Sequence, residues 1–458
     1  MATTAPTPRI ERSVTALTGK VVLPEQQNWD EARLAWNLSV DQQPAAIVFP
    51  ESAEDVIAAV ELARALGLRV TAQGTGHNAG PLGALEDTVL VKTERMRGIE
   101  IDPEAGIARV DAGVRSLELV EAAAKHGLAP LAGSSPDVGV VGYTLGGGLS
   151  WFGRKHGLAS SNVHAIELVT ADGRLVRADR EHEPDLFWAL RGGGGGFGIV
   201  TALELRLFPI SEVYAGILWW PIERDREILH AWAELTRREL PDELTTVARY
   251  LRLPPLPDIP EPIRGQSFVV VEVIHLGAPE LADELLAPLR ALGPVMDTIQ
   301  PIPTPALAHM HMDPEHPVPA TGDGILLRKL PPEALDEVIR TAGAASPSPL
   351  VSLELRQLGG ELARSHPDTG ALDAVDADYG LYAVGIAPTP EAVARVKAHI
   401  EVVMDALRPW AAGRAYLNFA ETRRDPSTFW TETAHHRLRR IKASLDPDNL
   451  IRSNQPVD

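Results

Sequence analysis

The sequence predicts an α+β fold, because its first half alternates strands with helices and its second half is dominated by strands. A change in composition after Pro209 separates these halves, and a second change near residue 411 begins a last segment. We therefore expect three parts, at 1–208, 209–410 and 411–458. A chain of 458 residues is long enough for two or three domains.

The best-defined element of the first part is a helix over 53–66. Ser52 is its expected N-cap, Asp55 lies three residues further on, and Gly67 is expected to end the helix. The other elements expected here are strands at 45–49, 68–72, 88–91, 108–112 and 203–207, a helix at 116–126, and a hairpin at 165–176 turned by Asp172-Gly173.

The second part reads as a mainly antiparallel sheet with helices packed on one face, which leaves the other face free to cover something. Its expected strands are 214–219, 247–253, 268–275, 325–330, 351–358 and 381–386, and its expected helices lie near 222–239, 279–292, 332–342 and 389–407. In the last segment we expect a short strand at 415–419 and a basic amphipathic helix at 436–445.

Composition narrows the class of protein. The net charge of −19 argues against a nucleic-acid partner. The sequence contains no run of eighteen apolar residues, so we expect no membrane span. Residues 1–12 lack the apolar core of a signal peptide, and the chain has no cysteine. We therefore expect a cytoplasmic protein without disulfides or thiolate metal sites.

Two glycine-dense stretches suggest a bound cofactor. The first, 73–78, follows an expected strand and contains His77, and the second runs over 133–148. Glycine lets a backbone pass close to a ligand with its amides directed at phosphate oxygens. A nucleophilic imidazole beside such a loop suggests a cofactor that is cradled and covalently tethered.

Together the motifs resemble the berberine-bridge-enzyme-like FAD-linked oxidases of the vanillyl-alcohol-oxidase superfamily, which include bacterial 6-hydroxynicotine oxidases. The resemblance rests on Gly74-Thr75-Gly76-His77, on the Ser135-Pro136 to Gly148 loop, and on three further segments at 155–162, 191–200 and 416–450. It implies a two-part FAD-binding domain, 1–208 closed by the C-terminal segment 411–458, and a substrate-binding domain at 209–410.

The resemblance also implies which residues hold FAD. His77 would be bonded to the 8α-methyl carbon of the flavin. Many members add a second bond from a cysteine at the position of Ser135; without cysteine, any link would be single. His77 read alone is a loop histidine that caps a turn, and Asn162 either contacts FAD or only caps a turn. The implied cofactor residues are Gln73, Gly74, Thr75, Gly76, His77, Asn78, Ser135, Pro136, Val138, Gly139, Val140, Gly142, Tyr143, Gly146, Gly147, Asn162, Val200 and Asn418.

The residue implied as catalytic base is Tyr416, in a Tyr-x-Asn motif, and the alternative is a buried tyrosine bonded to backbone. Glu354 and Arg356 share one face of an expected strand by period-two spacing. Such a face is usually solvated, but in this family the sheet covers the flavin. Glu354 is then a second catalytic candidate, and Arg356 and Tyr382 are substrate-binding candidates.

The implied activity is an FAD-dependent oxidase, with a small organic or glycosidic substrate and O2 as partners. A hydride would pass from an alcohol or amine carbon to the flavin, and O2 would become hydrogen peroxide. Val140 occupies the place of a small residue that family oxidases have beside the flavin. The alternatives are a dehydrogenase with another electron acceptor and a flavin-binding protein without catalysis.

The loop 309–316 is the remaining candidate for a site. His309, His311 and His316 lie there with two carboxylates, a composition that suits a metal. Their spacing fits no common metal signature, so we expect a plain surface or lid loop and no metal site.

Overall fold

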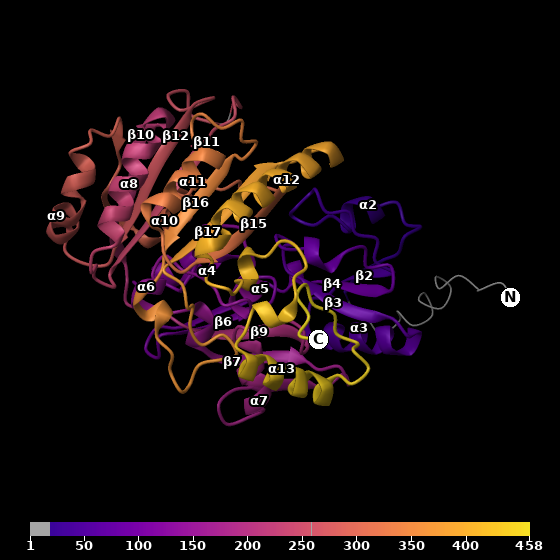
Figure 1. Ribbon diagram of the computed structural model, residues 1–458. Coiled ribbons are helices and arrows are strands. Elements are labelled where there is room, and N and C mark those ends of the chain that lie inside the picture. The colour runs from indigo at the N-terminus through magenta and orange to yellow at the C-terminus, as the bar shows by residue number, and fades with distance from the viewer. Residues whose placement is uncertain (1–18, 258) are drawn as a thin grey trace.

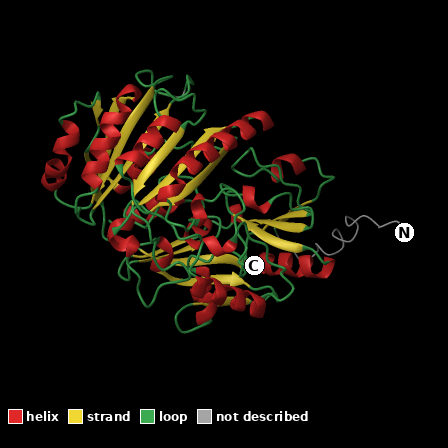
Figure 2. Ribbon diagram, in the orientation of Figure 1, coloured by secondary structure: helices red, strands yellow, loops and turns green. Residues whose placement is uncertain are grey.

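The computed structural model describes residues 19–257 and 259–458, within which the strands form three sheets (Figure 1). The expectation for residues 1–12 lies outside the described residues. Two of the sheets and the C-terminal segment lie together, and the third and largest sheet forms a separate layer beside them (Figure 2). Among the described residues, no helix combines the length and the apolar character that crossing a bilayer would need.

The first sheet has four strands in the order β1-β2-β4-β3, with β2, β4 and β3 parallel and β1 antiparallel to β2. Helix α3 (Ala53–Leu66) connects β2 to β3. As predicted, the Ser52 hydroxyl accepts from the Asp55 amide at 3.4 Å, and Gly67 ends the helix with φ of +67°. The strands are β1 (Lys20–Val22), β2 (Ala46–Phe49), β3 (Arg69–Gln73) and β4 (Thr88–Lys92).

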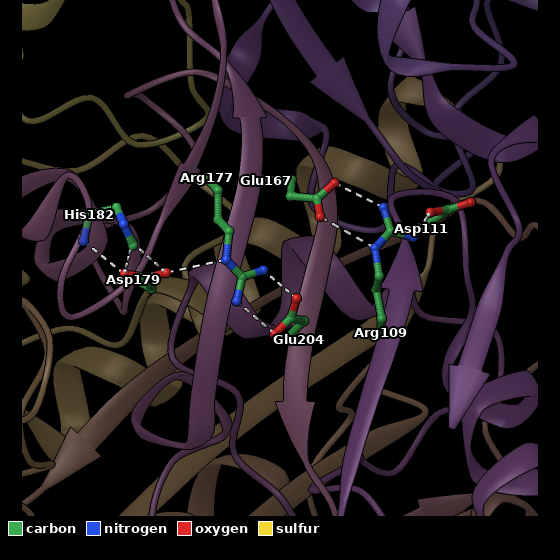
Figure 3. Close-up of polar contacts among 7 residues, drawn as sticks. All are labelled: Arg109, Asp111, Glu167, Arg177, Asp179, His182 and Glu204. Atoms are coloured by element: carbon green, nitrogen blue, oxygen red, sulfur yellow. Dashed lines mark hydrogen bonds and ion pairs between the residues drawn. The ribbon is translucent and has the colours of Figure 1, made fainter. Parts of the chain in front are cut away.

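The second sheet is antiparallel, in the order β5-β6-β9-β7-β8, and it contains the predicted hairpin as β7 and β8. Ion pairs join four of its strands, as Figure 3 shows for Arg109, Asp111, Glu167, Arg177, Asp179, His182 and Glu204. The elements are β5 (Ile99–Asp102), β6 (Ile107–Asp111), β7 (Val163–Val169), β8 (Leu175–Ala178), β9 (Ile199–Arg206), α4 (Ser116–Ala124), α6 (Gly153–His156) and α7 (Pro184–Leu190).

A short helix, α5 (Val140–Leu145), lies inside the second glycine-dense stretch and was not predicted. Four glycines within the nine residues 139–147 hide its periodicity, since glycine disfavours helix. Its place next to the loop 133–139 makes it part of the candidate site described below.

The third sheet is antiparallel, in the order β13-β10-β12-β11-β16-β17-β15, with β14 also paired to β10. Helices α8, α9, α11 and α12 bury their apolar side chains against one face of it, as predicted (Figures 1 and 2). The elements are β10 (Glu212–Pro221), β11 (Leu244–Arg252), β12 (Ser267–His275), β13 (Met296–Asp297), β14 (Gln300–Pro303), β15 (Ala320–Leu327), β16 (Ser352–Gln357), β17 (Tyr379–Ile386), α8 (Asp225–Thr236), α9 (Pro279–Arg290), α10 (Leu307–Met310), α11 (Pro332–Ala342) and α12 (Pro390–Leu407).

The C-terminal segment returns to both of the smaller sheets. The strand predicted at 415–419 is wrong: Leu417–Phe419 is a 3-10 turn, because Phe419 packs directly on the third sheet. A Cβ atom at Gly324 would lie 2.7 Å from the Phe419 Cβ atom, and one at Gly380 would lie 3.2 Å from its ring. These two glycines therefore create the space that lets this segment approach the sheet.

Helix α13 (Glu432–Leu445) then leads to a buried ion pair that closes the fold. The Lys442 ammonium donates to Asp446 Oδ2 at 2.6 Å and to the carbonyl oxygens of Gly196 and Ile451 at 2.8 and 2.9 Å. Ile451 forms a parallel bridge with Val70 of β3. The pair thus ties the chain end to both the first sheet and the glycine run before β9.

We predict that Lys442→Met destabilises the protein by about 3–5 kcal/mol, because it leaves the buried Asp446 carboxylate without its cation. Thermal unfolding at equal cofactor content measures this as a melting temperature several degrees lower. Lys125→Met, at an exposed lysine, is the matched control and should change stability by less than about 0.5 kcal/mol. Equal melting temperatures for the two variants would show that the Lys442–Asp446 pair does not hold the C-terminal segment in place.

Candidate active site

Three segments far apart in the sequence meet at one place. The Asn78 amide donates to the carbonyl oxygens of Leu417 and Ala420 at 3.4 and 3.2 Å, which joins the first glycine loop to the C-terminal segment. The Asn418 amide donates to the Tyr143 carbonyl oxygen at 2.9 Å, which joins the same segment to α5. The turn at 416–420 is therefore held between both glycine-dense stretches.

His77 lies at the edge of this junction. Its Nδ1 atom is 2.7 Å from the Thr75 hydroxyl, and its Nε2 atom is 3.3 Å from Asp137 Oδ1 of the second loop. The Trp36 ring stacks on the imidazole, with 4.0 Å between centroids and 18° between planes. The imidazole thus contacts both glycine-dense stretches, and it does not act as a turn cap.

The second loop is held against α4 by its backbone. The amides of Ser116 and Leu117 donate to the carbonyl oxygens of Val138 and Pro136 at 2.9 and 2.8 Å. Ser135 donates its hydroxyl to Asp137 at 3.2 Å. These contacts hold the loop against α4.

Five of the glycines of the two stretches fall into two groups. At Gly146 a Cβ atom would lie 1.8 Å from Asn418 Oδ1, and at Gly147 it would lie 3.1 Å from Tyr416 Oη, so these glycines admit the C-terminal segment. At Gly142 a Cβ atom meets nothing within 4 Å, and at Gly74 and Gly139 the nearest atoms are 3.9 and 3.8 Å away. The protein's own packing does not require this second group.

Buried polar atoms without a hydrogen-bond partner belong to both glycine-dense stretches, to the third sheet and to the C-terminal turn. Native interiors leave few such atoms unpaired. Among the described residues, those near the junction include Gln73 Oε1, His77 Nε2, Asn78 Oδ1, Tyr143 Oη, Arg356 Nε and Tyr416 Oη. Open backbone beside unpaired donors and acceptors is the arrangement that a polar cofactor with phosphates and a heteroaromatic ring would complete, so the residues present fit FAD.

Two of the implied cofactor residues have evident structural roles. Asn162 donates its amide to the carbonyl oxygens of His156 and Leu158, both at 2.9 Å, which is the turn-capping alternative of the two that the sequence allowed. Val200 lies buried in β9, paired with Leu168. Neither contact excludes a backbone contact to a ligand.

The face of the third sheet opposite its helices is polar and buried. The strand register places Arg249, Glu354 and Tyr382 side by side on β11, β16 and β17. Arg356 donates to Glu354 Oε2 at 3.3 Å and lies over the Trp151 ring at 4.7 Å. Glu354 and Arg356 are buried, and Arg356 lies against Trp151 from the first part of the chain, so the expectation that this face is solvated is wrong.

His311 belongs to this polar face and corrects the expectation of a plain surface or lid loop. Its ring is buried, with Nδ1 2.8 Å from Glu272 Oε2 and Nε2 3.4 Å from Glu354 Oε2. Its carbonyl oxygen accepts from Arg249 at 2.9 Å. Among the described residues, no group of three side chains is arranged to hold a metal ion.

Tyr416 is buried among apolar side chains, with its hydroxyl turned to the junction. Burial raises its pKa, while the Arg356 guanidinium, the amides of Gly148 and Leu149 and the Asn418 side chain act in the opposite direction. None of these donors reaches Tyr416 Oη in good hydrogen-bond geometry. The amides of Gly148 and Leu149 lie beside this hydroxyl, so the catalytic role of Tyr416 and the alternative of a tyrosine held by backbone both stay predictions.

Tyr382 differs from Tyr416 because its hydroxyl has a partner. It donates to Glu421 Oε1, and Glu421 Oε2 accepts from the Gly322 amide at 2.8 Å. Burial raises the pKa of Tyr382 well above its ordinary value, with Glu421 adding to the effect, and burial likewise raises the pKa of Glu421. Tyr382 is therefore a neutral hydrogen-bonding group on this face.

The sequence suggested no site role for Trp36, Asp137, Arg249, Glu272 and Glu421, and it placed His311 in a plain surface or lid loop. Glu272 carried a signal, since it is the one charged residue in the otherwise apolar run 268–274 of β12. Burial raises the pKa of Glu272, but Arg249 and His311 outweigh it, and the pKa lies below its usual value.

Comparisons with known proteins agree with this geometry. The FAD binding domain family matches residues 44–179, and the berberine and berberine-like family matches residues 415–458. The chain is 34% identical to (R)-6-hydroxynicotine oxidase of Paenarthrobacter nicotinovorans over 61% of this chain and 59% of that protein. It is 31% identical to the uncharacterized FAD-linked oxidoreductase YvdP of Bacillus subtilis over 68% of this chain and 67% of that protein.

A solved structure gives the same fold. The crystal structure of 6-hydroxy-D-nicotine oxidase from Arthrobacter nicotinovorans superposes with a TM-score of 0.80 at 26% identity, covering 96% of this chain and 98% of that one. Both matched families occupy the segments that meet at the junction. The chain belongs to the berberine-bridge-enzyme-like family of FAD-linked oxidoreductases.

Proposed function

We propose that this oxidoreductase is an oxidase, which takes a hydride from an alcohol or amine carbon of a small substrate and passes the electrons to O2. The observation that carries the proposal is the set of unpaired buried groups, Tyr143, Arg356 and Tyr416, between open glycine backbone and a polar sheet face. Similarity to a protein named 6-hydroxynicotine oxidase supports this class of reaction.

We further propose that FAD is held by the two glycine-dense stretches, by the turn that contains Asn418 and by β9. His77 is the single point of covalent attachment. When bound, FAD supplies the acceptor for the hydride and the two electrons. The open glycines Gly74, Gly139 and Gly142 allow the backbone to approach it, and Ser135 cannot form a second link because it carries a hydroxyl.

Tyr416 and Glu354 together remove the proton in this proposal. Burial keeps Tyr416 protonated, so its own proton must leave as the proton of the substrate arrives. Arg356 lowers the pKa of Tyr416 and also pairs with Glu354, which is the carboxylate that accepts this proton. Arg356 and Tyr382 are the proposed substrate-binding residues, because Arg356 Nε is an unpaired donor and Tyr382 lies beside Glu354 on the same sheet face.

The apolar surroundings of Tyr416 serve to exclude water from the reacting atoms. Leu149, Leu326 and Leu358 pack around its ring with relative exposures of 6% or less. A dry site strengthens the effect of each nearby charge on the phenol. We propose that the small side chain of Val140, beside the open glycines, gives O2 access to the flavin. We also propose a cytoplasmic location.

The purified protein should be yellow, and a panel of alcohols, oligosaccharides and cyclic amines should contain a substrate that bleaches its flavin absorbance anaerobically. On admission of air, the absorbance should return with one hydrogen peroxide formed per substrate oxidised. Reoxidation by a quinone but not by air would favour the dehydrogenase alternative. A protein that no substrate bleaches would favour a flavin-binding protein without catalysis.

Gly142→Ala should weaken FAD binding by roughly tenfold or more without lowering the stability of the apoprotein, because its methyl group fills only ligand space and alanine favours helix over glycine. Fluorescence titration with FAD measures the affinity, and denaturant unfolding measures the stability. Gly146→Ala is the contrasting variant, since it collides with Asn418 and should lower both. Wild-type affinity in Gly142→Ala would remove this glycine from the cofactor site.

Tyr416→Phe should slow anaerobic flavin reduction by about 10²–10⁴-fold, the usual effect of removing a proton acceptor, with little change in substrate affinity. Stopped-flow spectroscopy at saturating substrate measures the rate constant. Tyr379→Phe is the matched control, because Tyr379 faces the helices and bonds Thr236 at 2.9 Å. A Tyr416→Phe rate within threefold of wild type, at equal FAD content, would exclude the proposed role.

A further inference from the structure

The imidazole of His77 is held by three side chains from different parts of the chain. Trp36 stacks on one side of the ring, the Thr75 hydroxyl lies 2.7 Å from Nδ1, and Asp137 Oδ1 lies 3.3 Å from Nε2. The two ring nitrogens therefore face chemically different neighbours. This difference decides where the imidazole carries its proton.

Asp137 is itself fixed and ionised. The Trp36 indole N–H donates to Asp137 Oδ2, and the Ser135 hydroxyl donates to Oδ1 at 3.2 Å. Burial raises the pKa of the carboxyl, but the interactions with His77, Trp36 and Ser135 outweigh burial and hold the pKa below its usual value. A carboxylate that is both buried and oriented presents a constant negative charge to Nε2.

This charge selects one tautomer of His77. A carboxylate can only accept a hydrogen bond. The tautomer of His77 with its proton on Nε2 is therefore favoured over the tautomer with a lone pair on Nε2. The Thr75 hydroxyl can donate or accept, and it adapts by donating to the lone pair on Nδ1. At 3.3 Å, Nε2 makes no well-directed hydrogen bond, so the selection by Asp137 is electrostatic.

We propose that Asp137 is a positioning residue for covalent flavin attachment, which directs the reaction to Nδ1 of His77 by holding the proton on Nε2. The inference rests on the proposed single link through His77. Trp36 assists by fixing both the imidazole plane and the carboxylate. Asp137 does not touch the reacting carbon; it acts through the histidine.

The step balances with dioxygen as the oxidant. A bond forms between Nδ1 and the 8α-methyl carbon, and one C–H bond of that methyl group breaks. The hydrogen of that C–H bond and the Nε2 hydrogen of the imidazole leave as two protons with two electrons and convert one O2 to one hydrogen peroxide. As Nδ1 gives up its lone pair the imidazole becomes cationic, and the Asp137 carboxylate 3.3 Å from Nε2 stabilises this charge until the Nε2 proton leaves.

The test uses the full-length apoprotein mixed with FAD in air. Samples are acid-precipitated over time, and the flavin that stays with the protein is measured by fluorescence on a denaturing gel. We expect complete attachment in wild type, none in His77→Ala, and an attachment rate about tenfold or more lower in Asp137→Ala and Asp137→Asn. The Asn variant can donate to Nε2 and so favours the opposite tautomer.

Three controls separate positioning from loss of structure. FAD affinity of His77→Ala and the Asp137 variants, from a separate titration, should stay within threefold of wild type. Asp41→Asn removes an exposed carboxylate that pairs with Arg33 and should attach flavin at the wild-type rate. NMR of the flavin-bearing peptide isolated from the wild-type protein should show the link on Nδ1.

The outcomes distinguish the two proposals. Wild-type protein that releases its flavin in acid overturns the covalent link and this inference with it, while tight FAD binding would survive. Covalent wild type with normal attachment rates in both Asp137 variants overturns the inference alone, and so does a link found on Nε2. Slow attachment with unchanged FAD affinity, linked through Nδ1, supports it.

Discussion

The return of residues 416–421 into the space between the two glycine-dense stretches and the large sheet is the constraint on which the site depends. Asn78 and Asn418 bond this turn to the first loop and to α5, and Phe419 packs where Gly324 and Gly380 carry no side chain. The Lys442–Asp446 pair fixes the chain that follows. Without this return, Tyr416 would have no defined position relative to either the loops or the sheet.

The same return encloses a polar sheet face that would otherwise meet water. Burying several ionisable groups is unfavourable unless they are paired. Here Arg356 pairs with Glu354, and Arg249 and His311 surround Glu272. The pairing is incomplete at Arg356 Nε and Tyr416 Oη, and also at Arg249 Nε and Glu272 Oε1. A buried polar group without a partner lowers the stability of the fold. We therefore expect these groups to gain their partners from a bound ligand.

Local signals in the sequence were sufficient for the framework of the fold. Ser52 and Gly67 mark the ends of α3, and Asp172-Gly173 marks a hairpin, because caps and turns depend on neighbouring residues. The strand expected at 415–419 failed because a tertiary contact of Phe419 overrides its local preference. Helix α5 was missed because glycines lie within it and on both sides of it, and glycine disfavours helix.

The candidate site divides in the same way. His77, Tyr416 and Glu354 could be named from motifs and from strand alternation, and the structure brings them to one region. The roles of Asp137, His311 and Glu421 could not be predicted, because they arise from partners 39 to 60 positions away in the chain, namely His77, Glu272 and Tyr382. The register between strands β11 and β16, which aligns Arg249 with Glu354, likewise cannot be predicted from the sequence of either strand alone.

The most direct test of the account is an experimental structure of the FAD-loaded protein. The account predicts the flavin ring at the junction, with its dimethyl edge at His77, its backbone contacts at Gly139 and Gly142, and its reacting face toward Tyr416 and Arg356. A flavin ring elsewhere, or one separated from the polar face of β11, β16 and β17 by protein side chains, would contradict it.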